Sequence, residues 1–206
     1  MRQRGFSLVE LLVAISILGL LMVAAMPSIG AWLDNTRIRN TADSILTGLQ
    51  MARQEAVRTN QNVSLSFVTS SSNPGGMAND CTLSNGSGSW VVSANFPASH
   101  CADATGTTPA MIVLTRGMGG DSNRVSVQAL QADGSTAATT VTFNGFGRVA
   151  NSDAVAVISL NGSGGAAYRN LRIWLSPSGS AQMCDPAVSA TTDPRVCPTK
   201  PAPSAP

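Results

Sequence analysis

The sequence is poor in the side chains on which most enzyme chemistry depends. Its 206 residues include one histidine, and aromatic residues make up 4% of the chain. His100 adjoins Cys101, but sequence neighbours seldom face each other productively, and a cysteine in a disulfide has no thiolate with which to attack. No nucleophile elbow, phosphate loop, dinucleotide fingerprint or zinc-protease motif occurs. We therefore expect no catalytic residues, no cofactor and no metal site, and we expect a non-enzymatic protein.

A large excess of one charge is also missing. Charged residues make up 12% of the chain, and the formal net charge is +2. Arg2 and Arg4 both precede Gly5, so removal of the first five residues would lower Lys+Arg from 13 to 11, against 11 acidic residues. Broad binding to nucleic acid needs several cationic contacts to phosphates, so this balance argues against it and leaves room only for a local patch.

The four cysteines show no C-x-x-C spacing, which argues against zinc and thioredoxin-like chemistry and favours disulfides. Three connectivities are possible. We favour the sequence-local one, Cys81 with Cys101 and Cys184 with Cys197, because each pair brackets a loop-like segment. Both bonds would need an oxidising compartment such as the periplasm.

A long apolar run stands near the N-terminus. From Phe6 to Met26 the sequence is FSLVELLVAISILGLLMVAAM, which holds one charge. A helix of this length rises roughly 32 Å, enough to cross a bilayer. Arg2 and Arg4 precede the run and no basic residue follows before Arg37, so the positive-inside rule leaves the N-terminus in the cytoplasm and the remainder outside.

Three ordinary interpretations compete for this run: a cleaved secretory signal, a plain membrane anchor and a buried core helix. Its length and flanking arginines disfavour a core helix. Val23-Ala24-Ala25 could serve as a signal cleavage site, but Glu10 fits a secretory signal poorly. A carboxylate within a membrane segment costs up to roughly 3 kcal/mol, so Glu10 needs a partner. Cleavage after Gly5 would create one, the new amino group of Phe6 on the same or a neighbouring subunit.

The sequence RGFSLVELLVAISILGLLMVAAMPS resembles the N-terminus of type IV prepilins: a short basic leader ending in Gly, then Phe, then an acidic residue four positions later within an apolar helix. The resemblance implies cleavage between Gly5 and Phe6 by an inner-membrane prepilin peptidase and N-methylation of Phe6. It also implies assembly with other pilins or pseudopilins through the helix, with Glu10 facing a neighbouring N-terminus.

Beyond this run, Pro27 predicts either a kink or a simple end of the helix. Apolar residues at spacings of three and four then indicate an amphipathic helix that continues to about Thr59. We expect this stripe to support a globular head rather than a second membrane contact. Its members are Ile38, Ala42, Ile45, Leu49, Ala52 and Ala56.

After Asn60 the alternation of Val63, Leu65 and Phe67 with polar residues predicts a first strand. Six further strands are expected, separated by Gly, Ser, Asn and Pro clusters, at 90–94, 111–115, 124–130, 139–143, 154–160 and 171–175. The predicted class is α+β, a long helix packed on one antiparallel β-sheet head. The predicted regions are a leader at 1–5, a transmembrane assembly helix at 6–29, its amphipathic continuation at 30–60, the head at 61–183 and a disulfide-tethered, Pro-rich tail at 184–206.

Three downstream segments narrow the resemblance. QMARQEAVR at 50–58, FNGFGRV at 143–149 and IWLSPSGSAQMCDP at 173–186 are similar to the minor-pilin family that includes the FimT and GspH types. The resemblance implies a minor subunit that primes a type IV pilus, which serves twitching motility. The alternatives are a minor pseudopilin of type II secretion and a DNA-binding minor pilin for natural transformation.

The DNA-binding alternative is not favoured. Members of the family that bind DNA are associated with a basic Gly-Arg-x-Arg motif near the C-terminus, where this chain has Gly179-Ser180-Ala181-Gln182. Arg148, Arg169 and Arg172 are left as weak candidates for phosphate contacts; a solvated strand face is the alternative. The expected course is a single-pass subunit in the inner membrane, with its head in the periplasm, and later a pilus or pseudopilus at the cell surface.

Overall fold

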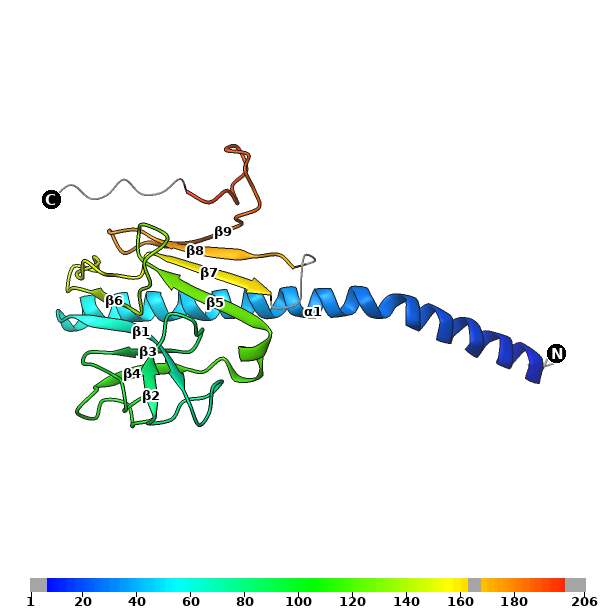
Figure 1. Ribbon diagram of the computed structural model, residues 1–206, viewed down its shortest axis with the longest axis horizontal. Helices are drawn as coiled ribbons and strands as arrows, with labels where there is room; N and C mark the ends of the chain where they lie inside the picture. The colour runs from blue at the N-terminus through cyan, green and yellow to red at the C-terminus, as the bar shows by residue number, and fades with distance from the viewer. Residues whose placement is uncertain (1–6, 163–167, 199–206) are drawn as a thin grey trace, which may run out of the picture.

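In the residues that the structure describes, the protein consists of one long α-helix and a β-rich head that packs on one side of the helix's second half (Figure 1). The structure, a computed structural model, describes residues 7–162 and 168–198, without the side chains of 24–29. Helix α1 spans Leu8–Thr59. The Ser7 side chain caps its start by accepting the N–H of Glu10, and Asn60 ends it in a left-handed conformation. The helix therefore runs through Pro27 rather than ending there, and a kink at Pro27 stays a prediction.

The head contains two antiparallel sheets, and α1 contacts both of them. In the first sheet the order is β2-β1-β3-β4, with β6 paired to β1, and in the second it is β5-β7-β8-β9. The α+β class is confirmed, but the strands form two sheets, joined through the 3-10 helix η1 (Gly119–Asn123). The strands are β1 (Val63–Ser70), β2 (Cys81–Leu83), β3 (Trp90–Ser93), β4 (Ile112–Arg116), β5 (Val125–Leu130), β6 (Thr140–Phe143), β7 (Val157–Gly162), β8 (Leu171–Leu175) and β9 (Ala181–Cys184).

One core joins the helix to both sheets. All six members of the predicted helix stripe are at most 2% exposed, and they pack with residues of β1, β3 and β6 on one side and of β5, β7 and β8 on the other. Gly48 permits the closest approach, because a Cβ there would lie 2.8 Å from Leu65 Cδ1 and 3.0 Å from the Trp90 ring. Trp90 donates its indole N–H to Ser44 Oγ at 3.2 Å. The second half of α1 is therefore the central element of the head.

The two disulfides pair cysteines that are close in sequence. Cys81–Cys101 belongs to a second apolar cluster, which also includes Val68, Val91 and Ile112 of the first sheet. Because this cluster adds to the core beside the helix, most of β1 is buried on both faces. Cys184–Cys197 holds the tail beside the end of β9, where the Asp185 N–H donates to the Arg195 carbonyl at 2.8 Å.

Candidate functional site

The first half of α1 is an exposed apolar surface. Its twelve large apolar side chains between Leu8 and Val23 are each 51–76% exposed, and Glu10 is exposed among them. An exposed apolar surface this extensive indicates contact with lipid or with the helices of other subunits. Gly5 and Phe6, the predicted cleavage and methylation site, lie outside the described residues.

The structure describes only part of the predicted membrane span at 6–29, because residue 6 and the side chains of 24–29 lie outside the described residues. Within the described part of the chain, no helix is both long enough and apolar enough to cross a membrane.

The three downstream segments that suggested the family meet at one point of the head. Arg53 of α1 donates from Nε to the Gly147 carbonyl oxygen at 3.0 Å. Gly179, in the turn between β8 and β9, lies against the same oxygen so closely that a Cβ would clash with it. The helix, the loop after β6 and the β8–β9 turn are thus joined at this contact. This contact therefore docks a loop of each sheet onto the helix.

A second junction lies nearer the exposed half of the helix. Arg37 donates from Nη1 to Asp34 Oδ1 at 2.6 Å, and its Nε lies 3.2 Å from Asp121 Oδ1 of η1. The hydrogen bond from Arg37 lowers the pKa of Asp34, burial opposes this shift, and a hydrogen bond from Tyr168 lowers the pKa further. Tyr168 precedes β8, so the junction ties α1 to η1 and to the segment that leads into the second sheet. Sequence reasoning missed this junction, because its residues lie far apart in the chain.

The three arginines considered for phosphate contact do not form one surface. Arg148 is exposed in the loop beside Arg53, whereas the Arg169 backbone N–H donates to Asn35 Oδ1 at 2.7 Å, eighteen helix positions earlier. That separation along α1 is about 27 Å. Arg172 lines a cavity with Trp174 on the face of the second sheet opposite the helix core. Its buried Nε has no hydrogen-bond partner among the described residues.

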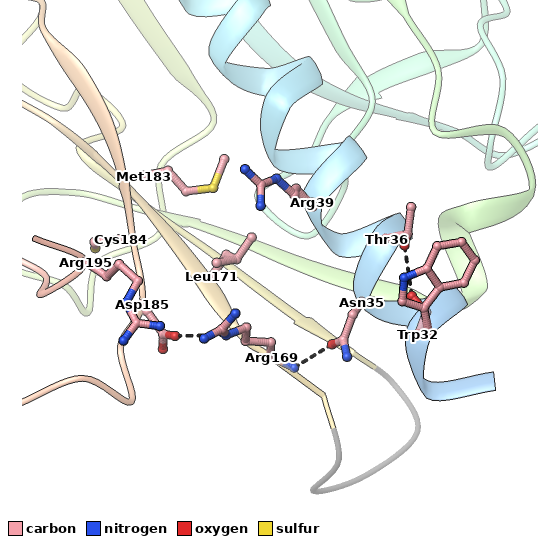
Figure 2. A pocket seen from close by; sticks show the side chains of 10 residues that line it. All are labelled: Trp32, Asn35, Thr36, Arg39, Arg169, Leu171, Met183, Cys184, Asp185 and Arg195. Atoms are coloured by element: carbon pink, nitrogen blue, oxygen red, sulfur yellow. Dashed lines mark hydrogen bonds and ion pairs between the residues drawn. The ribbon is translucent and has the colours of Figure 1, made fainter. Parts of the chain in front are cut away.

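A groove of about 700 Å³ opens between α1 and the end of the second sheet (Figure 2). Leu171 and Met183 contribute apolar surface to its lining. The charged and aromatic groups are Trp32 and Arg39 from the helix, Arg169 before β8, Asp185 after β9 and Arg195 in the tail. The sequence analysis singled out Arg169 from this set and overlooked Trp32, Arg39 and Arg195. A tryptophan directly after an apolar run and two isolated arginines are too common to have revealed the groove.

Comparison with known proteins gives first the class of the protein. Residues 1–26 match the prokaryotic N-terminal methylation motif, so the chain is a prepilin-like subunit. This motif implies processing by a prepilin peptidase and anchoring in the inner membrane before assembly with other pilins.

Residues 41–179 match the family described as type II transport protein GspH, and the chain belongs to this family. It is therefore a minor pilin or pseudopilin of a type IV pilus or of type II secretion, a structural protein and not an enzyme.

Among solved structures, the chain is similar to the type IV minor pilin FimU of Pseudomonas aeruginosa in two crystal forms. In space group P65 the identity is 15% and the TM-score 0.42, covering 70% of this chain and 90% of FimU. In space group P21 the identity is 15% and the TM-score 0.45, covering 74% and 91%. No curated protein sequence matches the chain.

Proposed function

We propose that this protein is a structural and priming subunit of a type IV pilus. It is cut after Gly5, methylated on Phe6 and held in the inner membrane by residues 6–29, with the head in the periplasm, before it enters the filament. The observation that carries the proposal is the division of α1 into two halves. Its first half is apolar and exposed, whereas its second half is the core of the head. Such a helix suits a subunit whose head stays folded while its apolar half passes from lipid to the neighbouring helices of a filament. Two disulfides fit a periplasmic head.

A second candidate is a minor pseudopilin of type II secretion, which the description of the family favours. It uses the same processing and the same helix, so the two candidates differ in the machine and not in the chemistry of the subunit. DNA binding is not favoured, because Arg148, Arg169 and Arg172 lie at separate places on the head.

The first experiment is the intact mass of the membrane-extracted protein from cells with and without prepilin peptidase. We expect a mass that lacks Met1–Gly5 and carries one added methyl group, and only when the peptidase is present. A full-length mass in both strains, or cleavage near Ala25, would refute the assembly role.

Deletion of the gene then separates the machines. Loss of surface pili and of twitching, with secretion intact, supports the pilus subunit. Loss of type II secretion with pili intact supports the pseudopilin, and loss of DNA uptake with filaments intact would support the nucleic-acid role instead.

A further inference from the structure

The groove between α1 and the second sheet lies next to the predicted membrane exit of the helix. If the span ends at residue 29, Trp32 follows about 4.5 Å further along the helix and Asn35 about 9 Å further. The headgroup layer on each side of a bilayer is roughly 5–7 Å thick. Trp32 is 66% exposed, and tryptophan is enriched at this interface because its ring is apolar and its N–H is polar. Trp32 therefore lies within the headgroup layer, and the mouth of the groove at Asn35 lies about 2–4 Å beyond it, within the length of an arginine side chain.

The charges of the groove suit an anionic ligand. Arg39, Arg169 and Arg195 have side chains that are 75%, 63% and 54% exposed. Asp185 is the one acidic residue among the described residues of the lining, and its Oδ2 lies 3.4 Å from Arg169 Nε. Arg195 Nη2 lies 2.7 Å from Asp193 Oδ2, and Arg39 Nε lies 4.0 Å from Asp43 Oδ2. Each arginine side chain is more than half exposed, so phosphate oxygens can reach it alongside its carboxylate partner.

Figure 2 shows that Trp32, Asn35, Arg169, Asp185 and Arg195 lie in this order across the groove, from the helix to the tail. Arg39 and Met183 lie above this row in the view. This arrangement offers guanidinium groups next to the headgroup layer and apolar side chains beside them. A free inorganic anion would leave Trp32, Leu171 and Met183 unused, whereas a phospholipid supplies both a phosphate and a glyceride.

We propose that this groove binds the headgroup of an anionic phospholipid from the outer leaflet of the inner membrane while the subunit waits for assembly. The inference rests on the membrane anchor of the proposed function. It adds a second contact with the bilayer, one that orients the head on the membrane surface and that is lost when the subunit leaves the bilayer.

The test uses the full chain in a neutral detergent, titrated with short-chain phosphatidylglycerol or with phosphatidylcholine of the same chain length. Trp32 emission reports binding, because Trp90 and Trp174 are at most 9% exposed. The Trp32→Phe variant gives the background. We expect tighter binding of phosphatidylglycerol in the wild type, and the double variant Arg169→Gln/Arg195→Gln should lose this preference by roughly 5-fold for each arginine.

The control Arg116→Gln/Arg148→Gln changes the net charge equally at two exposed arginines away from the groove and should keep the preference. Arg169→Gln leaves the buried Asp185 without its cation, so Arg39→Gln/Arg195→Gln is a second test that keeps this pair. Equal affinity for the two lipids in the wild type, or equal losses in control and groove variants, would overturn the proposal. Binding of duplex DNA or of an acidic peptide that needs the groove arginines, without a lipid preference, would overturn it as well.

Incorporation of the same protein into nanodiscs separates this proposal from the proposed function. A chain that co-elutes with nanodiscs but shows no lipid preference refutes only the headgroup site. A chain that fails to enter nanodiscs refutes the anchor and, with it, the headgroup site.

Discussion

Substitution of Gly179 by alanine tests whether the meeting point of helix and sheets stabilises the head. Gly179 has a φ of +83°, and an added Cβ would press on the Gly147 carbonyl oxygen that accepts from Arg53. Gly134 is a matched control, since its φ is +73° and a Cβ there meets no atom within 4 Å. The left-handed backbone costs an alanine roughly 1–2 kcal/mol, partly offset by about 0.4–1 kcal/mol from the less flexible unfolded chain. Gly134→Ala should therefore cost about 1 kcal/mol.

Gly179→Ala carries the same backbone cost and must also move the Gly147 carbonyl. A hydrogen bond to a charged donor contributes about 1.5–3 kcal/mol, so the loss of the Arg53 contact brings the total to about 2.5–4 kcal/mol. Urea unfolding of the full chain in detergent, followed by tryptophan fluorescence, measures both variants, because Trp90 lies in the core. Equal destabilisation by the two substitutions would refute the reasoning, because the contact with Gly147 would then contribute nothing.

Three further predictions concern the other contacts. Arg37 lowers the pKa of Asp34 below its value in the unfolded chain, so Asp34 stabilises the fold at neutral pH, and the effect is lost progressively as pH falls below about 4 and through the lowered pKa. Asp34→Asn should lower the urea midpoint at pH 7, and by less at pH 3. The Cys184–Cys197 disulfide stabilises the folded tail by about 3 kcal/mol relative to the open chain, so the Cys184→Ser/Cys197→Ser variant should be cleaved faster by trypsin in this tail; Asp153→Asn is the control. Glu10→Gln should leave processing and membrane insertion intact, shown by intact mass, but reduce the number of assembled filaments counted by electron microscopy.

The sequence predicted the helix and most of the strands because both signals are periodic. The stripe from Ile38 to Ala56 follows the helical repeat, and all of its members are buried. Seven strands were predicted within about three residues of their bounds, and Leu171–Leu175 agrees at both ends. The missed strands, β2 and β9, are three and four residues long. β3 and β6 are also four residues long, but they are rich in β-branched and aromatic residues, whereas β9 (AQMC) has none and β2 (CTL) has one. Pairing with a longer neighbour defines the two missed strands.

The division into two sheets could not be predicted, because each sheet is defined by long-range pairing. β6 returns to β1 across more than seventy residues, where Ser64 and Thr142 join hydroxyls at 2.8 Å. The groove was hidden for the same reason. Trp32 and Arg169 come together only when the segment before β8 docks on Asn35 of the helix. The contact of Arg53 with Gly147 could not be predicted either, although the sequence segment that contains each residue was recognised.

The two halves of α1 also determine how precisely the subunit can be positioned. In the second half, one apolar stripe fixes the rotation of the helix against the head, because only that face fits the core. In the first half, apolar side chains surround the helix, so lipid or neighbouring helices can cover any face. A helix of this kind has no preferred rotation from hydrophobicity alone, and a single polar group then decides its register. Glu10 is the one charged residue between Leu8 and Val23, so we expect register in a filament to depend on it and affinity to depend on the surrounding surface.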